Sequence, residues 1–384
     1  MNVDYIFFLG QQEKDLLEIE PVIRKVSGKI IILTLGNYIY VKQLKRIFPK
    51  HKIYSISSFF FYKYKFLGLL LFFKYLLKNF LSSKKNKGIV YSKIFFKTCL
   101  DHALYYDLSN KIITKKIFFD NSANKFLFQK IYKMVNKDTM FYSYSLNGLY
   151  LSNDQLVSNY LYNNIDVLFC YGQGDSEVLR KIKSINSAHY PRDIIEVGSV
   201  RNYFFKKKFK KRKNRIKKIL YIKSNPSLID NIDNKSLELL LNSLRNIKAK
   251  FEIIVKERPV QTELNFKHRI IKNNLLKLDQ VIFNKDIKTE ELICSSDIIC
   301  GTLTSSFMQG IYFNKLVVQI NSNKMFWNNF KKKKLLGCND ALECKKVFNK
   351  IHNNANYKKY LNKQQIIKNK IFRKKINPTK LIVS

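Results

Sequence analysis

Short apolar runs of strand length alternate with segments of helical spacing, and this pattern occurs twice along the chain. In the first half the runs lie at residues 5–9, 29–33, 52–56, 116–119, 139–144, 167–171 and 193–197. In the second half they lie at residues 219–222, 251–255, 281–283, 297–300 and 316–320. Strands that alternate with helices over short connections form parallel sheets covered on both faces. The sequence therefore predicts an α/β protein with two Rossmann-like domains that face a central cleft.

A basic segment separates the two halves. Residues 206–218 read KKKFKKRKNRIKK, which is the sharpest change of composition in the chain. Blocks of like charge repel one another and stay solvated, as expected of a linker. We therefore predict an N-terminal domain at residues 1–205, a linker at residues 206–218 and a C-terminal domain at residues 219–384. Residues 338–370 are predicted to form helices that cover the second domain.

The net charge of +43 on 384 residues would ordinarily point to nucleic acid or to an anionic membrane. Lysine is, however, spread through the whole chain beside abundant Ile, Asn, Phe and Tyr, a mixture that an A/T-rich genome would impose on any protein. No base-reading module accompanies the basic segment, so no nucleic acid is expected as a partner. A non-catalytic protein that binds polyanions or nucleic acid is kept as an alternative function.

Residues 58–81 are nearly all aromatic, aliphatic or lysine. The longest uncharged run, residues 66–73, is too short to span a bilayer. The segment is predicted either as a helix lying in the headgroup region of a membrane or as a buried helix with its lysines at the edges. Together with residues 206–218 it indicates an anionic inner-membrane surface as a partner. The N-terminus lacks the pattern of a signal peptide, so we expect a cytoplasmic protein.

The six cysteines form no CxxC pair and no Cys/His ligand spacing. Neither a zinc site nor a disulfide framework is therefore predicted. We expect no metal and no cofactor. Gly172 and Gly174 are too close together for a dinucleotide-binding fingerprint and are interpreted as a turn.

The turn at residues 301–306 is the strongest candidate binding element. It follows an apolar strand and opens a helix, where free N–H groups and hydroxyls stabilise an anion such as phosphate. Thr304, Ser305 and Ser306 are the predicted phosphate ligands. The alternative is that Thr304 or Ser305 only caps the helix.

Further polar residues follow other predicted strands. Asp120 comes directly after the strand at residues 116–119, where its carboxylate would act as a general base or would cap the next helix. The other candidates for the cleft follow the predicted strands at residues 193–197, 219–222 and 251–255: Gly198, Ser199, Ser224, Asn225, Lys256 and Arg258. The alternative for Lys256 and Arg258 is ordinary surface charge.

Two Rossmann-like halves, a basic residue with proline after a strand of the second half, and a Ser-Ser turn resemble the bacterial GT-B glycosyltransferases of surface polysaccharides such as capsule and lipopolysaccharide. The sialyltransferases and polysialyltransferases that use CMP-sialic acid carry an acidic-acidic-Gly, a His-Pro and a Ser-Ser motif. The CDP-glycerol glycerophosphotransferases carry a Lys-Pro-His-Pro-like element and a similar Ser-Ser turn.

Only Ser305-Ser306 matches these motifs cleanly. Arg258-Pro259 stands where His-Pro is expected, and Asp120-Asn121-Ser122 lacks the second acid and the glycine. Gly198-Ser199-Val200-Arg201 is similar to the Gly-Ser-x-Arg that often closes the first domain of this superfamily.

The resemblance implies an acceptor-binding first domain and a second domain that binds a nucleotide-sugar donor, with a CMP-sugar favoured. Asp120 would take a proton from the acceptor, and Lys256 and Arg258 would offset charge on the departing phosphate. Thr304, Ser305 and Ser306 would bind that phosphate without a metal. Arg258 would stabilise charge but, unlike histidine, could not donate a proton. A CDP-glycerol-type transferase is the alternative with the same fold.

Overall fold

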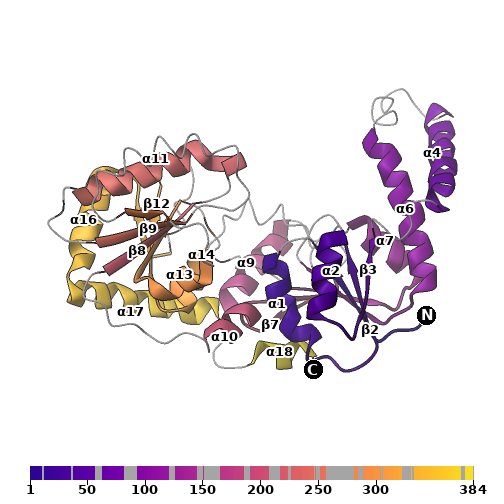
Figure 1. Cartoon of the computed structure of the whole chain (residues 1–384), viewed down its shortest axis with the longest axis horizontal. Coiled ribbons are helices and arrows are strands. Elements are labelled where there is room, and N and C mark those ends of the chain that lie inside the picture. The colour runs from indigo at the N-terminus through magenta and orange to yellow at the C-terminus, as the bar shows by residue number, and fades with distance from the viewer. Residues whose placement is uncertain are drawn as a thin grey trace.

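The computed structural model describes residues 1–10, 13–35, 38–56, 63–81, 93–120, 126–144, 150, 165–185, 191–206, 217–223, 226–245, 247, 251–256, 281–283, 289–302, 304, 306–321, 330, 333–372 and 377–383. Figure 1 shows two α/β bodies side by side, each built on one sheet. The predicted strands are all present, and their bounds differ from the prediction by one or two residues at most.

The first body is built on a seven-stranded parallel sheet with the order β3-β2-β1-β4-β5-β6-β7. Its strands are β1 (Tyr5–Leu9), β2 (Ile30–Thr34), β3 (Lys52–Ser55), β4 (Lys116–Phe119), β5 (Met140–Tyr144), β6 (Val167–Cys170) and β7 (Asp193–Glu196). Its helices are α1 (Glu13–Ile23), α2 (Tyr38–Ile47), α4 (Lys63–Leu81), α6 (Lys93–Lys111), α7 (Phe126–Val135), α9 (Gln173–Ile185) and α10 (Val200–Lys206).

The core of this sheet lies on both of its faces. Along β1, Ile6 and Phe8 belong to one buried cluster, whereas Phe7 and Leu9 belong to another. Successive side chains of a strand point to opposite faces, so both faces of β1 must be covered by helices. This is why β1 is a continuous apolar run and does not alternate with polar residues.

The second body is built on a six-stranded parallel sheet with the order β10-β9-β8-β11-β12-β13. Its strands are β8 (Lys217–Ile222), β9 (Phe251–Lys256), β10 (Val281–Phe283), β11 (Ile298–Gly301), β12 (Leu316–Ile320) and β13 (Leu336–Cys338). Its helices are α11 (Pro226–Arg245), α13 (Thr289–Ser295), α14 (Ser306–Tyr312), α16 (Ala341–His352) and α17 (Asn354–Ile371). The predicted fold class, two Rossmann-like domains, is confirmed.

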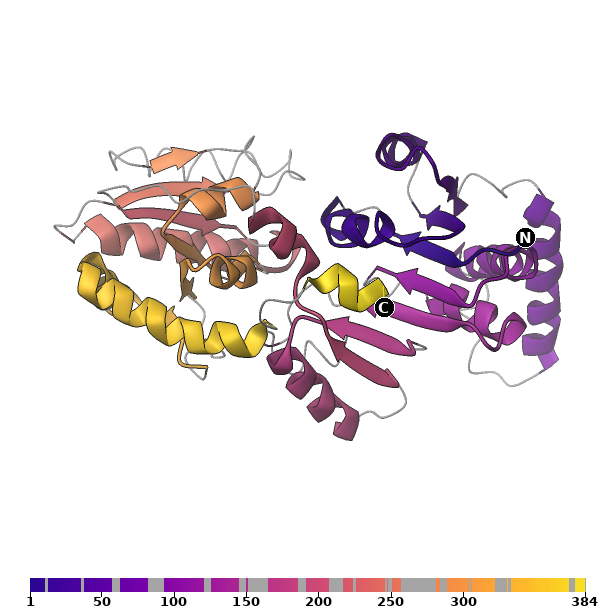
Figure 2. The same cartoon turned by 90° about the horizontal axis from the view of Figure 1, so that it is seen from below.

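The last helix, α18 (Pro378–Val383), returns to the first body. It packs against α1 and α10, and Figure 2 shows it beside the first sheet. The rings of Tyr171 and Phe372 stack with centroids 5.6 Å apart where the chain crosses back. The first body is therefore completed by residues from the very end of the chain.

Four details differ from the expectations. Helix α6 lies where no element is predicted, and β13 is an edge strand at the start of the stretch predicted to be helical. Gly174 lies in the first turn of α9 and not in a separate turn, because the helix begins at Gln173. Both ends of the stretch predicted as a linker belong to regular elements, because Lys206 ends α10 and β8 already begins at Lys217.

Helices α4 and α6 form a hairpin that projects from the first body (Figure 1). A side chain at Gly68 would place its Cβ 2.4 Å from Cδ2 of Leu100, so glycine permits the close approach of the two helices. Helix α6 also packs against α7, which attaches the hairpin to the first body. No helix in the described part of the chain is long and apolar enough to cross a membrane.

Candidate functional site

In each sheet the strand order reverses at one place, and the polar residues of interest lie at the carboxyl ends of those strands. The reversal falls between β1 and β4 in the first sheet and between β8 and β11 in the second. In open parallel sheets, ligands bind beyond the carboxyl ends of the strands at this switch point, because the connecting helices depart to opposite faces there. Two candidate half-sites follow, one on each body.

Asp120 is the polar residue at the first switch point. It directly follows β4 and is 1 % exposed. Its backbone N–H donates to the carbonyl of Phe8 over 3.2 Å, and its Oδ2 accepts a hydrogen bond from the N–H of Gly10. The carboxylate is thereby held at the ends of β1 and β4. The described helix α7 begins only at Phe126, so Asp120 lies well before its first turn.

Two buried lysines lie at the carboxyl ends of neighbouring strands: Lys223 directly follows β8, and Lys256 is the last residue of β9. Lys256 is 7 % exposed and Lys223 is 6 % exposed. The N–H of Lys223 donates to the carbonyl of Lys256 over 3.0 Å, which continues the pairing of the two strands. Buried lysines are uncommon because desolvation of an ammonium group is costly. These two positions therefore bring cationic groups to the carboxyl edge of the second sheet.

The two lysines lie on opposite faces of this sheet. Lys223 Nζ donates to Oδ1 of Asn234 on α11 over 2.8 Å. Ile254, two residues before Lys256 on the same strand, packs in the cluster that contains Phe307 of α14. Because residues two apart share a face, Lys256 lies on the α14 face. Lys223 was not among the predicted site residues.

The turn after β11 contains a buried network around Asp233. Thr302 Oγ1 donates to Oδ1 of Asp233 over 2.8 Å, and the hydroxyl of Tyr221 lies 3.0 Å from the same oxygen. The amide of Gln319 donates to the carbonyl of Thr302 over 2.9 Å. Burial and the nearby Asp233 raise the pKa of Tyr221 well above its ordinary value, so this hydroxyl keeps its proton. Strands β8 and β12 thus hold the end of β11 in place.

The turn then enters α14. Thr304 Oγ1 accepts a hydrogen bond from the N–H of Ser306 over 3.2 Å, which is the arrangement of a helix cap. A Cβ at Gly301 would lie 2.7 Å from the carbonyl oxygen of Ile222. Only glycine allows β11 to pass so close to β8 there. Thr304 and Ser306 follow β11, which is one of the two strands at the switch point, and Lys256 lies on the face of the sheet that α14 covers.

Gly198 and Ser199 lie in the first body, after β7. Gly198 has a positive φ of 89°, and its carbonyl accepts a hydrogen bond from the hydroxyl of Tyr144. Ser199 is buried and its Oγ lies 3.5 Å from Oε1 of Glu18. Both residues therefore bind to groups of their own domain. Arg258, Ser305, Ser224 and Asn225 lie outside the described residues.

Glu18 on α1 is a buried carboxyl group that the sequence did not reveal. It accepts hydrogen bonds from the N–H of Arg201 over 2.9 Å and from the hydroxyl of Tyr171 over 3.1 Å. Burial raises its pKa from 4.5 to about 7, against the opposing effect of Arg201 and the hydrogen bonds. The partners lie more than 150 residues away in sequence, so no local pattern could have revealed the group.

Side-chain contacts join the two bodies. Arg201 on α10 forms an ion pair with Glu290 on α13. Lys333 Nζ donates to the carbonyl of Tyr150 and lies 3.5 Å from the centroid of its ring. At the other side, Lys370 on α17 pairs with Glu177 on α9 over 3.1 Å. The switch points are therefore carried by two domains that contact each other.

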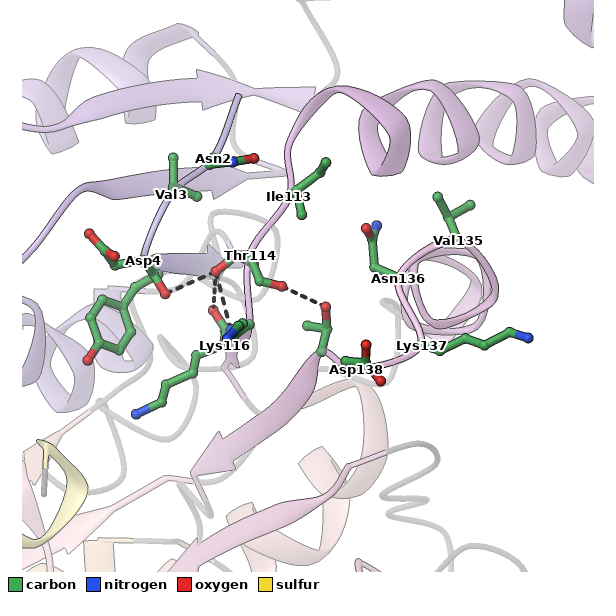
Figure 3. Close-up of a pocket in the computed structure, with 13 residues that line it drawn as sticks. Asn2, Val3, Asp4, Ile113, Thr114, Lys116, Val135, Asn136, Lys137 and Asp138 are labelled. Atoms are coloured by element: carbon green, nitrogen blue, oxygen red, sulfur yellow. Dashed lines mark hydrogen bonds between the residues drawn. The ribbon is translucent and has the colours of Figure 1, made fainter.

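A large cavity lies elsewhere in the first body. It has a volume of about 810 Å³ and is lined by residues 2–5, 113–116 and 135–139 (Figure 3). These residues precede or begin β1, β4 and β5, so the cavity lies at the amino ends of the strands. Thr114 Oγ1 donates there to the carbonyl of Asp4 over 3.0 Å. The cavity is thus at the opposite edge of the sheet from Asp120.

Within the described residues, no three His, Cys, Asp or Glu side chains are grouped closely enough to bind a metal ion. All six cysteines are free, and Cys170 and Cys300 are buried in strands, as hydrophobic residues are.

Comparison with known proteins gives a fold but no sequence family. No protein-family model matches the chain, and no curated protein matches its sequence. Solved structures do match over the whole length. UDP-GlcNAc 2-epimerase from Neisseria meningitidis, bound to UDP-GlcNAc, has a TM-score of 0.62 and 14% identity, with 100% of this chain and 98% of that chain covered.

Two further structures match over the same length, with lower TM-scores and identities. Anabaena Alr3699/HepE, in complex with UDP and glucose, has a TM-score of 0.55 and 9% identity, with 99% and 98% coverage. MurG from Acinetobacter baumannii has a TM-score of 0.56 and 9% identity, with 99% and 98% coverage. At such identities the likeness shows the fold, which is that of the GT-B enzymes.

Proposed function

We propose that the protein is a glycosyltransferase that moves a sugar from a nucleotide-sugar donor to a glycan or lipid-linked acceptor at the inner face of the membrane. The observation that carries this proposal is the position of the polar residues. Asp120 lies at the switch point of the first sheet, and Gly301, Thr302 and the start of α14 lie at that of the second. Fold alone does not establish function, so these positions have to carry the argument.

In this proposal Asp120 acts as the general base. A carboxylate within reach of the acceptor hydroxyl takes its proton while the hydroxyl oxygen attacks the anomeric carbon of the donor. The bond between that carbon and the phosphate oxygen breaks, and negative charge develops on the departing nucleotide. The hydrogen bond from Gly10 fixes the carboxylate at the ends of β1 and β4.

Lys256, Ser306 and the capped turn at Thr304 are proposed to bind the departing phosphate. Strands β9 and β11 are separated only by β8, so their ends are about 10 Å apart. A nucleoside diphosphate can bridge this distance. A cation and a helix N-terminus that are held in place stabilise developing charge without reorganisation during the reaction. Ser305 is proposed to bind the same phosphate, and Arg258 is proposed to offset its negative charge.

The donor nucleotide is proposed to be UDP. Both the epimerase from Neisseria meningitidis and HepE are described with UDP or a UDP-sugar bound, and their folds match over the whole chain. A CMP-sugar such as CMP-sialic acid is the second candidate, on the strength of the Ser-Ser turn at the start of α14. CDP-glycerol is the third, because it would use the same phosphate contacts.

Thermal unfolding in the presence of UDP, CMP and CDP tests the proposal. A ligand that binds only the folded state stabilises it by about 2.7 kcal/mol at one hundred times its Kd. We expect UDP to raise the melting temperature most, and Ser305→Ala/Ser306→Ala to abolish the shift. A matched control is Ser243→Ala/Ser295→Ala, whose hydroxyls bond to carbonyls within α11 and α13.

A stronger shift with CMP or CDP would reassign the donor. No shift with any nucleotide, together with tight binding to heparin or RNA, would contradict the transferase and favour a polyanion-binding protein. If the protein instead converts UDP-GlcNAc to an isomer and releases no UDP, it is an epimerase on the same fold.

A further inference from the structure

Helix α4 carries an apolar face that the rest of the described chain leaves exposed. Phe66, Leu70, Phe73 and Leu77 are 71 %, 52 %, 52 % and 67 % exposed. Their spacing of four, three and four residues places them along one side of the helix. The stripe is about 16 Å long at 1.5 Å per residue. Single exposed apolar residues are normal on a surface, but a continuous stripe of four is a binding surface.

The opposite side of α4 packs against the rest of the first body. Gly68 lies against Leu100 of α6, and Leu71 packs against the core of the first sheet. The helix is therefore fixed by its inner side, and the exposed stripe is not a core face that has lost its partner. Figure 1 shows α4 on the outer side of a hairpin that stands clear of the body.

The charge of α4 indicates what the stripe meets. The helix contains Lys63, Lys65, Lys74 and Lys78 and no acidic residue. Lys74 is exposed and lies one residue after Phe73, at the border of the stripe. Lysines beside an apolar face suit an anionic lipid surface, since their stems cover the apolar boundary while their ammonium groups meet phosphates. Pairing with a second copy would bring like charges together.

We propose that α4 docks the protein on an anionic lipid bilayer. The helix lies parallel to the membrane, with Phe66, Leu70, Phe73 and Leu77 at the boundary between headgroups and acyl chains. Lys74 contacts lipid phosphates beside them. The inference concerns binding alone, so its failure would remove the membrane location from the proposed function and leave the proposed transfer reaction untouched.

Cosedimentation of the full chain with vesicles tests the inference. We expect binding to vesicles that contain phosphatidylglycerol and weak binding to pure phosphatidylcholine. Leu70→Glu/Phe73→Glu should weaken binding to the anionic vesicles by at least about tenfold, because two apolar anchors are lost and two negative charges are added. The matched control is Leu342→Glu/Ile366→Glu, which makes the same charge change at exposed positions of α16 and α17 and should leave binding unchanged.

A second measurement does not require the docking variant to fold. Phe73→Trp in a chain with Trp327→Phe places the only tryptophan on the stripe. Lipids brominated in the acyl chains should quench its fluorescence in anionic vesicles. Unquenched tryptophan, or equal vesicle binding by the docking variant and the wild type, overturns the proposal. A wild-type dimer that the docking variant converts to a monomer would assign the stripe to a second copy and likewise overturn it.

Discussion

Asp120 and Glu18 are both buried carboxyl groups, yet their surroundings differ. Asp120 lies beyond the end of a central strand, and a backbone N–H of the neighbouring strand end points at it. Glu18 lies under α10 among Tyr171, Ser199 and Arg201, all of the same domain. The first position faces the region where a parallel sheet binds its ligand, whereas the second joins helices.

Asp120→Asn should abolish most of the turnover and leave nucleotide binding intact. The asparagine keeps an oxygen that accepts the hydrogen bond from Gly10, but it cannot take a proton. Loss of a general base costs roughly 100- to 10,000-fold in rate. Turnover and nucleotide binding are measured on the same preparation, with an unchanged melting temperature as the control for folding. Full activity of the variant would remove Asp120 from the mechanism.

Glu18→Gln should alter the dependence of stability on pH. The folded-state pKa of Glu18 is raised from 4.5 to about 7 by burial. Folding therefore keeps a proton on Glu18 that the unfolded chain releases above about pH 4.5. Its stabilising contribution is complete below pH 4.5 and is lost as the pH rises through 7, by an amount on the order of 3 kcal/mol.

Glutamine stays neutral at every pH and can still accept the N–H of Arg201. The free energy of unfolding of wild type minus that of Glu18→Gln should therefore fall between pH 4.5 and 7 and be constant above. Denaturant titrations at several pH values measure this difference, in which the titration of all other groups cancels. A difference that does not vary with pH would contradict the raised pKa.

The sequence alone identifies a buried polar residue only where a local pattern marks its position. Asp120 could be singled out because it directly follows an apolar run, which is a local signal. Glu18 could not, because its hydrogen-bond partners come from β6 and α10, and only the folded chain brings them together. Lys223 was passed over for the same reason, since only the structure shows that it is buried beside α11.

At the scale of elements, all strands except β13 were predictable, whereas helices α6, α10 and α18 were not. A strand covered on both faces is a continuous apolar run, as β1 and β11 are. Helix α6 packs against α4 and against α7, so its apolar residues do not follow a single stripe. Strand β13 has three residues at an edge and is recognised only by its pairing with β12. Neither element produces the local pattern on which prediction depends.

Thr302→Val should loosen the element that leads into α14. Valine has the same shape but cannot donate to Asp233, which would be left with one hydrogen bond fewer in a buried site. Such a loss costs roughly 1–3 kcal/mol. We expect both lower stability and weaker nucleotide binding, the second measured by calorimetry under conditions where the variant is folded.

Thr139→Val is the matched control. Thr139 is also buried and donates to the carbonyl of Thr114 over 2.6 Å, but it lies at the amino end of the first sheet. It should lower stability and leave nucleotide binding unchanged. If both variants weaken nucleotide binding equally, the network around Asp233 has no specific role in the donor site.

At the scale of the whole molecule, the last helix joins the two halves. Ile382 of α18 is buried in the cluster that contains Leu16 of α1, although α18 follows the second domain in sequence. The crossing passes the stacked rings of Tyr171 and Phe372, close to the ion pair of Lys370 and Glu177. The first domain therefore depends on residues that the chain supplies only after the second domain is complete.

Ile382→Ala should accordingly destabilise the first domain more than the second. Removal of a buried isoleucine side chain costs about 2–5 kcal/mol, whereas Ile366→Ala at an exposed position of α17 should change stability by no more than about 0.5 kcal/mol. In a Trp327→Phe background, Tyr360→Trp places the only tryptophan against the core of the second sheet, so its fluorescence follows that domain, while circular dichroism follows both. In guanidinium the variant should show a circular dichroism transition that begins before the fluorescence transition. Equal shifts of both transitions would mean that the two domains unfold as one unit, and no shift would mean that α18 adds nothing to the first domain.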